Sequence, residues 1–474
     1  MERKAIVLVI FGASGDLTSR KLIPALAKLE EKGWLPKVFR VVGISRTRMT
    51  DEQWREKLAA KFSMENDSQK EAWKRFSEKI HYYAGDVTDT ALFPALDKFL
   101  SEKAASFGIP AERIYYLATS PVFYESIAEG LRPLVQAQPS CRMVVEKPFG
   151  TDFETARALN EKLHEIFPEE SIFRMDHYLG KETAQNIMVL RFANAIFEPL
   201  WNRNYIEKVE ITALETSLVG RRLEYYNEAG ILRDMFQNHL LQLLTLVAME
   251  PPTRWKPEAI RNEKVKVLQG IRPMEYPYEI QQNSFLARYD GGEPELLPQT
   301  ATYARVSLQV DNWRWKGVPF LLTSGKGMPS QKTEIGIHFR PAPHILFDRE
   351  YIRKAQAQDP QIRTRDWEAN TLLLQIHPEA KIILLFQSKV PDTEKDIRQT
   401  QMQFDFTENF QGELPEAYER LLLDAIEGNP NLFPRGDEIE YAWKIIDPIQ
   451  RFYEGVDLPR YPMFQANIPE RGTN

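Results

Sequence analysis

The feature that most constrains the fold stands at the start of the chain. Ala5 to Phe11 form an uninterrupted apolar run, Gly12 to Leu17 read Gly-Ala-Ser-Gly-Asp-Leu, and leucine or isoleucine recurs at helical spacing from Leu22 to Leu29. A short run that is apolar at every position is typical of a strand buried on both faces of a parallel sheet. We therefore predict a strand, a glycine turn and a helix, which is the unit that opens a dinucleotide-binding domain.

The glycine turn suits a pyrophosphate group. Glycines let the backbone approach the phosphates closely, and the N-terminus of the following helix supplies unpaired N–H donors and the positive end of a dipole. Only two glycines fit the general Gly-x-Gly-x-x-Gly pattern, so the turn alone is about as compatible with a simple chain reversal as with dinucleotide binding. The predicted phosphate contacts are Gly12, Ala13, Ser14, Gly15, Asp16 and Leu17.

A second predicted strand, Phe39 to Ile44, ends just before Arg46. In a dinucleotide fold this strand end meets the adenosine ribose, where an acid selects a free 2′-hydroxyl and an arginine accommodates a 2′-phosphate. The sequence has no acid between this strand and Asp51. Arg46, with Thr47 and Arg48 as further candidate contacts, therefore predicts NADP as the cofactor and NAD as a weaker alternative. The competing interpretation is a loop of solvated arginines.

Four more strands are predicted in the first domain, at His81 to Val87, Arg113 to Ala118, Arg142 to Gly150 and Ile172 to Asp176. Lys147 lies at the C-terminal end of the third of these, the end where open parallel sheets bind their ligands. A lysine at a strand end is more commonly just a solvated charge.

The character of the sequence changes near residue 178. Predicted strands now follow one another, many with alternating polar and apolar residues, at 206–218, 301–310, 333–339, 371–376, 381–387 and 401–406. Such a succession indicates a largely antiparallel sheet. Helices are expected at 181–194, 230–249, 415–428 and 437–453. The predicted fold class is α/β plus α+β: a Rossmann-like domain over 1–178 and a domain with a large, mainly antiparallel sheet over 179–474.

Composition excludes several classes of partner. At 474 residues the chain is too long for one ordinary core, and its net charge of −6 argues against nucleic acid or a membrane surface as the main partner. The single cysteine, Cys141, cannot form an intrachain disulfide, which fits a reducing cytoplasm. The histidines other than His177 and His239 show no metal-ligand spacing, so we predict no metal.

Two segments concentrate chemically active side chains. The first runs from Asp176 to Lys181 and holds an acid, an imidazole, a phenol and an ammonium group. If the chain is helical from Tyr178 onward, His177 and Lys181 share a face that suits a phosphate dianion. The second segment, 230–242, clusters polar residues at the start of a strongly apolar helix that contains His239. A lone histidine on such a helix is more often a core residue than a catalyst.

Four motifs in order resemble those of glucose-6-phosphate dehydrogenases. They are Glu-Lys-Pro-Phe-Gly at 146–150, Arg-Met-Asp-His-Tyr-Leu-Gly-Lys at 174–181, Arg-Asp-Met-Phe-Gln-Asn-His-Leu at 233–240, and the segment 318–326 that ends at Lys326. The glycine turn also has the Gly-x-x-Gly-Asp-Leu form of that family. The resemblance spans about Ala5 to Tyr453 and covers both predicted domains.

The resemblance implies an NADP-dependent enzyme that oxidises C1 of D-glucose 6-phosphate to 6-phospho-D-glucono-1,5-lactone, the first oxidative step of the pentose phosphate pathway. His239 would be the general base and Asp176 would orient it. The other implied contacts are His177, Tyr178 and Lys181 for the phosphate, Glu215, Asp234 and Lys326 for the sugar, Lys147 between sugar and cofactor, and Asp86 and Val87 for the cofactor. The family precedent also implies a homodimer or homotetramer.

Two departures from the family pattern affect the edge of the implied substrate site. Gln331 stands where the family usually has a second basic residue, and His377 precedes Pro378 where the family commonly has glutamine. Two alternatives stay open: another phosphosugar dehydrogenase on the same fold, or a non-catalytic nucleotide-binding paralogue. A paralogue that had lost catalysis should lack His239, Asp176 or Lys147, and the chain retains all three.

Overall fold

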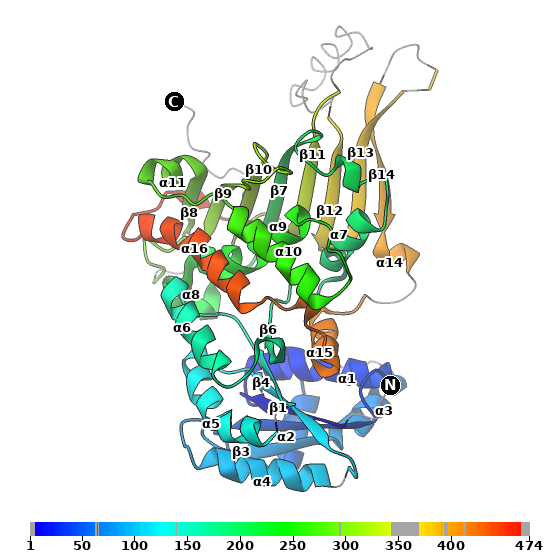
Figure 1. Cartoon of the computed structure of the whole chain (residues 1–474), viewed down its shortest axis with the longest axis vertical. Helices are drawn as coiled ribbons and strands as arrows, with labels where there is room; N and C mark the ends of the chain where they lie inside the picture. Colours follow the sequence, from blue (N-terminus) through cyan, green and yellow to red (C-terminus); the bar gives the residue numbers. More distant parts are fainter. Residues whose placement is uncertain are drawn as a thin grey trace. The chain divides into compact units, whose positions relative to one another are not determined.

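The computed structural model describes residues 5–61, 64, 66–105, 107–138, 140–292, 295–342, 369–389, 391–392, 397–410 and 414–465 (Figure 1). The chain divides into two compact units. The first comprises Met1–Lys181, Pro252–Asn262 and Pro415–Glu440, and the second comprises Glu182–Pro251, Glu263–Leu414 and Tyr441–Asn474. The predicted boundary at 178 lies three residues before the first break between the units. The assignment of two later segments to the first unit was not predicted from the sequence.

The first unit contains a six-stranded parallel sheet in the order β3-β2-β1-β4-β5-β6. Its strands are β1 Ala5–Phe11, β2 Val38–Ser45, β3 Ile80–Ala84, β4 Ala111–Leu117, β5 Arg142–Val145 and β6 Ile172–Arg174. Every residue of β1 is buried, as the unbroken apolar run predicts. The strand order reverses direction at β1, between β2 and β4, and open parallel sheets bind ligands at such a switch point. The prediction of a Rossmann-like sheet is confirmed.

Two helices of the first unit, α2 and α6, begin at side chains that bond their free N–H groups. Thr50 and Gln53 form a capping box at the start of α2, and Asp152 and Thr155 form one at the start of α6. The helices within this unit are α1 Ile23–Glu31, α2 Asp51–Ala59, α3 Asp67–Ser77, α4 Leu92–Ala105, α5 Tyr124–Ala137, α6 Phe153–His164 and α15 Ala417–Glu427. Helix α15 packs on α1, where Lys32 Nζ lies 2.5 Å from the buried carboxylate of Glu419. A distant segment of sequence thus becomes part of this unit.

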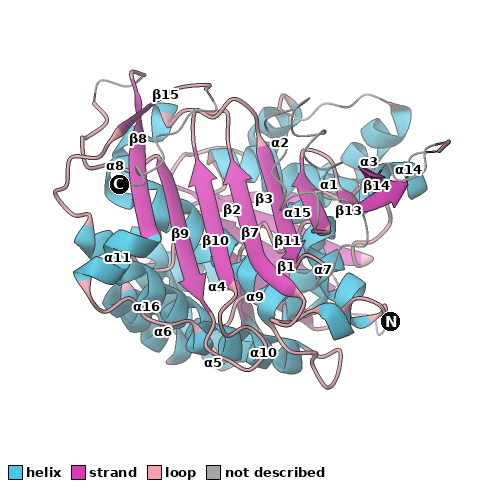
Figure 2. Cartoon of the chain, turned by 90° about the horizontal axis from the view of Figure 1, so that it is seen from above, coloured by secondary structure: helices cyan, strands magenta, loops and turns pink. Residues whose placement is uncertain are grey.

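The second unit contains a nine-stranded sheet in the order β14-β13-β12-β11-β7-β10-β9-β8-β15 (Figure 2). Its strands are β7 Ile206–Leu214, β8 Ser284–Asp290, β9 Tyr303–Gln309, β10 Pro319–Gly325, β11 Lys332–Phe339, β12 Thr371–His377, β13 Lys381–Lys389, β14 Ile397–Asp405 and β15 Arg460–Pro462. The pairs β7/β10 and β8/β15 are parallel, and the other pairs are antiparallel. The predicted sheet is confirmed, but β8, β10 and β15 were not predicted as strands.

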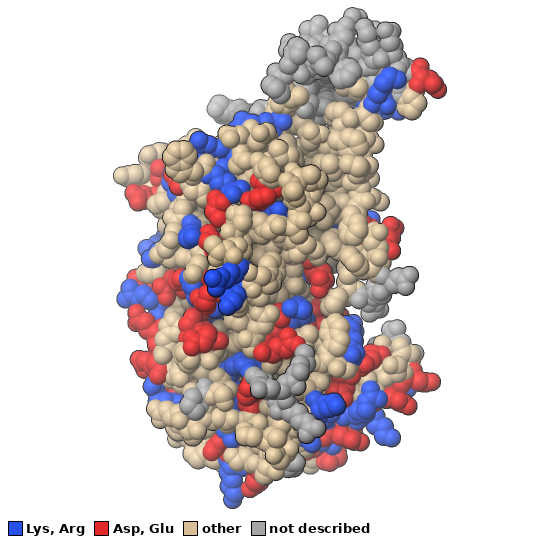
Figure 3. All heavy atoms as spheres, turned by 45° about the vertical axis from the view of Figure 1, so that its right-hand side comes forward, with Lys and Arg blue, Asp and Glu red and all other residues tan. Residues whose placement is uncertain are grey.

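The helices within the second unit are α7 Glu182–Phe192, α8 Leu223–Ile231, α9 Leu241–Ala248, α11 Pro277–Asn283 and α14 Phe406–Asn409. Two further helices, α10 Pro257–Gly270 and α16 Gly436–Phe452, contain residues of both units. Among the described residues, no helix combines the length and the apolar character that crossing a membrane requires. Figure 3 shows acidic and basic side chains interspersed over the face that it presents, rather than one patch of a single sign.

The turn after β1 generates a prediction about Gly12. This residue has φ +95°, and a Cβ atom added to it would lie 2.3 Å from the carbonyl oxygen of Ala118. Gly33 has φ +68° with nothing within 4 Å of the added Cβ, so it is a matched control. Gly33→Ala should cost about 1–2 kcal/mol for the left-handed backbone alone. Gly12→Ala should cost about 1–3 kcal/mol more because of the steric clash.

Urea unfolding of both variants measures the difference. Equal losses of unfolding free energy would show that the backbone at Ala118 moves aside without cost, and that close packing does not enforce glycine at position 12.

Candidate active site

The glycine turn is fixed by hydrogen bonds to its own backbone. The amides of Gly12 and Ala13 both donate to the carbonyl of Ile44, at 2.9 and 3.0 Å. The hydroxyl of Thr18 donates to the Gly12 carbonyl at 3.0 Å, and the indole N–H of Trp54 donates to the Ala13 carbonyl at 3.2 Å. These bonds hold the turn at the carboxyl ends of β1 and β2, where a dinucleotide pyrophosphate binds in this fold class.

Arg46 follows β2 and is exposed to solvent. Its loop is held by Tyr82, whose hydroxyl is 2.7 Å from the Ser45 hydroxyl and donates to the Thr47 carbonyl at 2.6 Å. Hydrogen bonds from Thr88 and the positive charge of Arg46 lower the pKa of Asp86. Two predicted cofactor residues are therefore close enough to interact. A carboxylate does face Arg46, but it comes from the loop after β3 rather than from the end of β2.

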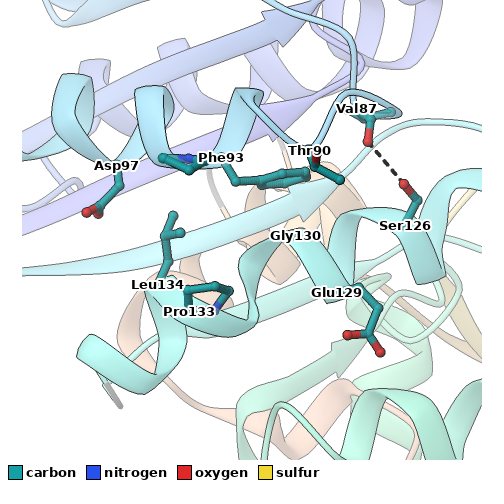
Figure 4. Close-up of a pocket in the computed structure, with 10 residues that line it drawn as sticks. Val87, Thr90, Phe93, Asp97, Ser126, Glu129, Gly130, Pro133 and Leu134 are labelled. Carbon is teal, nitrogen blue, oxygen red and sulfur yellow. Dashed lines mark hydrogen bonds between the residues drawn. The ribbon is translucent and has the colours of Figure 1, made fainter.

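A cavity of about 520 Å³ lies between α4 and α5, beside the Asp86–Val87 loop (Figure 4). The Ser126 hydroxyl on α5 donates to the Val87 carbonyl at 3.1 Å and holds that loop from the helix side. The lining residues are Val87, Thr90, Phe93, Pro94, Asp97, Ser126, Glu129, Gly130, Pro133 and Leu134. This lining includes two acids and no lysine or arginine, so it does not suit a phosphate group.

Lys147 follows β5 and stands next to Glu146, whose carboxylate and carbonyl oxygens both accept hydrogen bonds. The hydroxyls of Tyr116 and Tyr418 donate to one carboxylate oxygen of Glu146 at 2.6 and 3.2 Å, and the Tyr124 hydroxyl donates to the Glu146 carbonyl at 2.9 Å. Burial raises the pKa of Glu146, against the opposing effects of the two phenols and of Lys147. Tyr124 thus holds the backbone next to the half-buried Lys147, and the other two tyrosines hold the Glu146 side chain.

The segment from Asp176 to Lys181 is a turn, so the expectation of a shared helical face for His177 and Lys181 is wrong. The Leu179 amide donates to the Asp176 carbonyl at 3.1 Å, the Lys181 amide donates to the Tyr178 carbonyl at 3.2 Å, and α7 begins only at Glu182. The Asp176 carboxylate accepts the Tyr178 amide at 2.9 Å.

Helix α15 packs directly against this turn. A Cβ atom added to Gly180 would lie 2.5 Å from the Ala417 carbonyl oxygen. The Tyr418 ring is parallel to the His177 ring within 9°, with 6.4 Å between centroids. The Lys181 ammonium lies 4.2 Å from the centre of the Tyr178 ring. The predicted phosphate ligands His177, Tyr178 and Lys181 therefore lie close together because of a turn, and not because they share the face of a helix.

The second unit brings the three predicted sugar ligands together around Lys326. This lysine is 2% exposed, pairs with Glu215, and lies 3.9 Å from an oxygen of Asp234, which is also 2% exposed. The arrangement follows from the topology, because Glu215 follows β7 and Lys326 follows β10, and these neighbouring strands are parallel. The Glu215 amide donates to the Gly325 carbonyl at 2.8 Å. One ammonium and two carboxylates offer both donors and acceptors for sugar hydroxyls.

His239 is fully buried and lies on a π-helix, Leu232–Leu240, which precedes α9. The predicted continuous helix over 230–249 is therefore corrected: Gly230 has a non-helical φ of +59°, and regular α-helix begins only at Leu241. π-Helices are rare, appear mostly as short segments inside α-helices, and are frequent at functional sites. The hydrogen bonds of a π-helix join residues five apart. Asp234 and His239 are five apart, so they lie closer to the same side of this helix than they would in an α-helix.

Comparison with known proteins decides the family. The family model described as "Glucose-6-phosphate dehydrogenase, NAD binding domain" matches residues 9–186, and the one described as "Glucose-6-phosphate dehydrogenase, C-terminal domain" matches residues 188–471. The chain belongs to the glucose-6-phosphate dehydrogenase family. Together the two matches cover both units.

Full-length relatives agree with this assignment. The chain is 38% identical to a glucose-6-phosphate 1-dehydrogenase of Aggregatibacter actinomycetemcomitans over 469 residues, which are 95% of this chain and 92% of the relative. It is 40% identical to the one of Treponema pallidum over 463 residues, 94% of this chain and 88% of the relative. A solved structure titled "Glucose-6-phosphate dehydrogenase in complex with its substrate glucose-6-phosphate" matches with a TM-score of 0.87 and 31% identity, covering 97% of this chain and 94% of that one.

Of the two departures from the family motifs, Gln331 immediately precedes β11 and His377 ends β12. Gln331 is exposed, and the neighbouring Lys332 pairs with Glu334 on its own strand. Lys332 is therefore engaged rather than a simple substitute for the second basic residue. Sequence reasoning missed Glu146 and Tyr418. Glu146 stood inside a recognised motif, whereas Tyr418 comes from α15 and carried no motif of its own.

The Lys326 cluster generates a prediction about stability. Lys326→Met keeps most of the aliphatic stem but removes the ammonium that lies beside the buried Asp234 carboxylate. Breaking a buried ion pair by removing one partner costs about 3–5 kcal/mol. Lys316→Met is the matched control, because Lys316 is half exposed and pairs with Asp311 at 2.8 Å. A surface pair of this kind contributes about 0–1 kcal/mol.

Chemical denaturation of the two methionine variants gives the comparison. If Lys326→Met were no less stable than Lys316→Met, the two carboxylates would be compensated by other groups, and the cluster would not be organised by its lysine.

Proposed function

We propose that the chain oxidises the C1 hemiacetal of D-glucose 6-phosphate to 6-phospho-D-glucono-1,5-lactone. The C1 hydrogen leaves as a hydride to NADP⁺, and the proton of the C1 hydroxyl goes to a base, so that NADPH and one proton accompany the lactone. The family assignment supports the reaction. The observation that links this reaction to specific residues is the buried Lys326 cluster, which lies in the same unit as His239.

His239 is the proposed base. An imidazole suits this role because its unperturbed pKa lies near neutral pH, and a carboxylate on its other nitrogen fixes the tautomer and stabilises the imidazolium. Asp176 is the proposed partner. The burial of both side chains supports the assignment, since a low-dielectric environment strengthens the attraction between the carboxylate and the imidazolium that forms.

The proposed phosphate ligands are His177, Tyr178 and Lys181. Their clustering on one turn of the first unit supports this role, because an ammonium, an imidazole and a phenol supply donors to a dianion. Glu215, Asp234 and Lys326 would bind sugar hydroxyls, and Lys147 would reach between the sugar and the nicotinamide. The cofactor would lie along residues 12–17, Arg46, Asp86 and Val87. When bound, the oxidised nicotinamide of NADP⁺ would supply the hydride acceptor at its C4.

We also propose a homodimer or homotetramer located in the cytoplasm. The family precedent supports the oligomer. The cytoplasmic location is supported by Cys141, which is the single cysteine of the chain, is buried, and has its thiol pKa raised to about 11 by that burial. A buried, protonated thiol suits a protein that does not depend on disulfides.

A rate assay tests the proposed activity against its rivals. Reduction of NADP⁺ and of NAD⁺ is followed by absorbance with glucose 6-phosphate, glucose and other hexose phosphates. We expect the highest kcat/KM for glucose 6-phosphate with NADP⁺. A higher value for another sugar phosphate would favour the alternative dehydrogenase, and nucleotide binding without reduction of any substrate would favour the non-catalytic paralogue.

The first prediction concerns the base. His239→Asn should lower kcat by roughly two or more orders of magnitude, because general-base catalysis contributes that much. Its KM for glucose 6-phosphate should change little. Asp176→Asn should cause a smaller loss, since the imidazole remains but is badly oriented. Near wild-type turnover in purified, folded His239→Asn would refute the assignment.

The second prediction concerns the cofactor. Arg46→Ala should weaken NADP binding roughly ten- to a hundredfold, which is the range for one charge-assisted hydrogen-bonded contact. NAD binding should stay almost unchanged because NAD lacks the 2′-phosphate. Arg48→Ala, two residues away on the same exposed loop, should weaken NADP binding less than Arg46→Ala. Equal weakening of both cofactors by Arg46→Ala would mean that Arg46 contacts the adenine or supports the loop.

A further inference from the structure

A buried hydroxyl group lies at the Lys326 cluster and has no assigned role. Tyr226 is on α8 and is fully buried, and the Lys326 ammonium lies 5.3 Å from the centre of its ring. Its phenolic oxygen has no hydrogen-bond partner among the described residues. Buried tyrosine hydroxyls usually have a partner, and leaving one without costs about 1–3 kcal/mol. The fold thus keeps an unsatisfied polar group beside the proposed sugar ligands.

The charges around this hydroxyl define what it can do. Burial and the negative charges of Asp234 and Glu215 hold the pKa of Tyr226 well above its ordinary value. The phenol therefore stays protonated and keeps its O–H as a donor. Lys326 is paired with Glu215 and lies near Asp234. An O–H donor among an ammonium and two carboxylates matches a ligand that carries several hydroxyl groups.

We propose that the Tyr226 hydroxyl hydrogen-bonds one hydroxyl of the hexose and acts as a specificity-determining residue. This proposal rests on the proposed function, because it takes the Lys326 cluster as the sugar site. A site built to bond a substrate hydroxyl discriminates strongly against an analogue without it, since the protein group is then left unsatisfied. Tyr226 would therefore help the site to reject sugars that lack or invert that hydroxyl.

The test compares Tyr226→Phe with Tyr115→Phe. Tyr115 is a control because it is also fully buried and lies on β4 with no proposed ligand contact; its hydroxyl interacts with Arg113 and Cys141 rather than with the proposed sugar ligands. Each enzyme is assayed with glucose 6-phosphate and with its 2-deoxy, 3-deoxy and 4-deoxy analogues. Thermal unfolding without substrate is measured in parallel.

We expect Tyr226→Phe to lower kcat/KM for glucose 6-phosphate about five- to a hundredfold, the range for an unsatisfied buried partner. With the wild-type enzyme, one deoxy analogue should already show this loss of kcat/KM, because it lacks the hydroxyl that Tyr226 bonds. For that analogue, Tyr226→Phe should cause no further loss, and this is the coupling that a double-mutant cycle measures. Thermal stability should be unchanged or higher, because the substitution removes an unsatisfied group. Tyr115→Phe should leave the ratios between substrates unchanged.

Three outcomes would overturn the proposal. Equal losses on all analogues with a lower melting temperature would show a structural role for the hydroxyl. An unchanged kcat/KM would show that the hydroxyl makes no contact with the sugar. Losses of kcat/KM that are not coupled to any single deoxy position would show that Tyr226 does not recognise one particular hydroxyl. If the wild-type enzyme fails to oxidise glucose 6-phosphate, the proposed function fails instead, and the two failures are thereby distinguished.

Discussion

A buried ammonium group between two carboxylates is the interaction on which the candidate site of the second unit depends. Asp234 is almost fully buried, and an isolated carboxylate in that position would be costly. Lys326 supplies the compensating charge, and it reaches this position because β10 pairs in parallel with β7 within an otherwise largely antiparallel sheet. The parallel pair places two carboxyl ends side by side, so Glu215 and Lys326 meet where both strands stop.

In the first unit, neutral hydrogen-bond donors stabilise a glutamate carboxylate. Glu146 is half-buried next to Lys147, and two tyrosine hydroxyls share one of its oxygens. One of these tyrosines, Tyr418, also stacks on His177, so a single side chain of α15 supports two of the recognised motifs. This explains in physical terms why a helix distant in sequence belongs to the cofactor-binding unit. The motif residues alone would leave a buried carboxylate and an unsupported turn.

Much of the architecture could be predicted because its signals are local. The buried strand before Gly12 and the alternating strands of the second unit follow from periodicities of a few residues. The π-helix before Leu241 and the turn after Asp176 could not be predicted, because tertiary packing overrides the helical pattern there. The environment of Tyr226 was equally hidden from the sequence, since its neighbours come from the ends of β7 and β10 and from the π-helix.

The central proposal is that the Lys326 cluster and His239 of the second unit hold the sugar of glucose 6-phosphate. A crystal structure of the enzyme with this sugar phosphate tests it most directly. We predict that the sugar hydroxyls lie beside Glu215, Asp234 and Lys326, with C1 within reach of His239. A sugar bound away from Lys326, or with C1 distant from His239, would contradict the proposal.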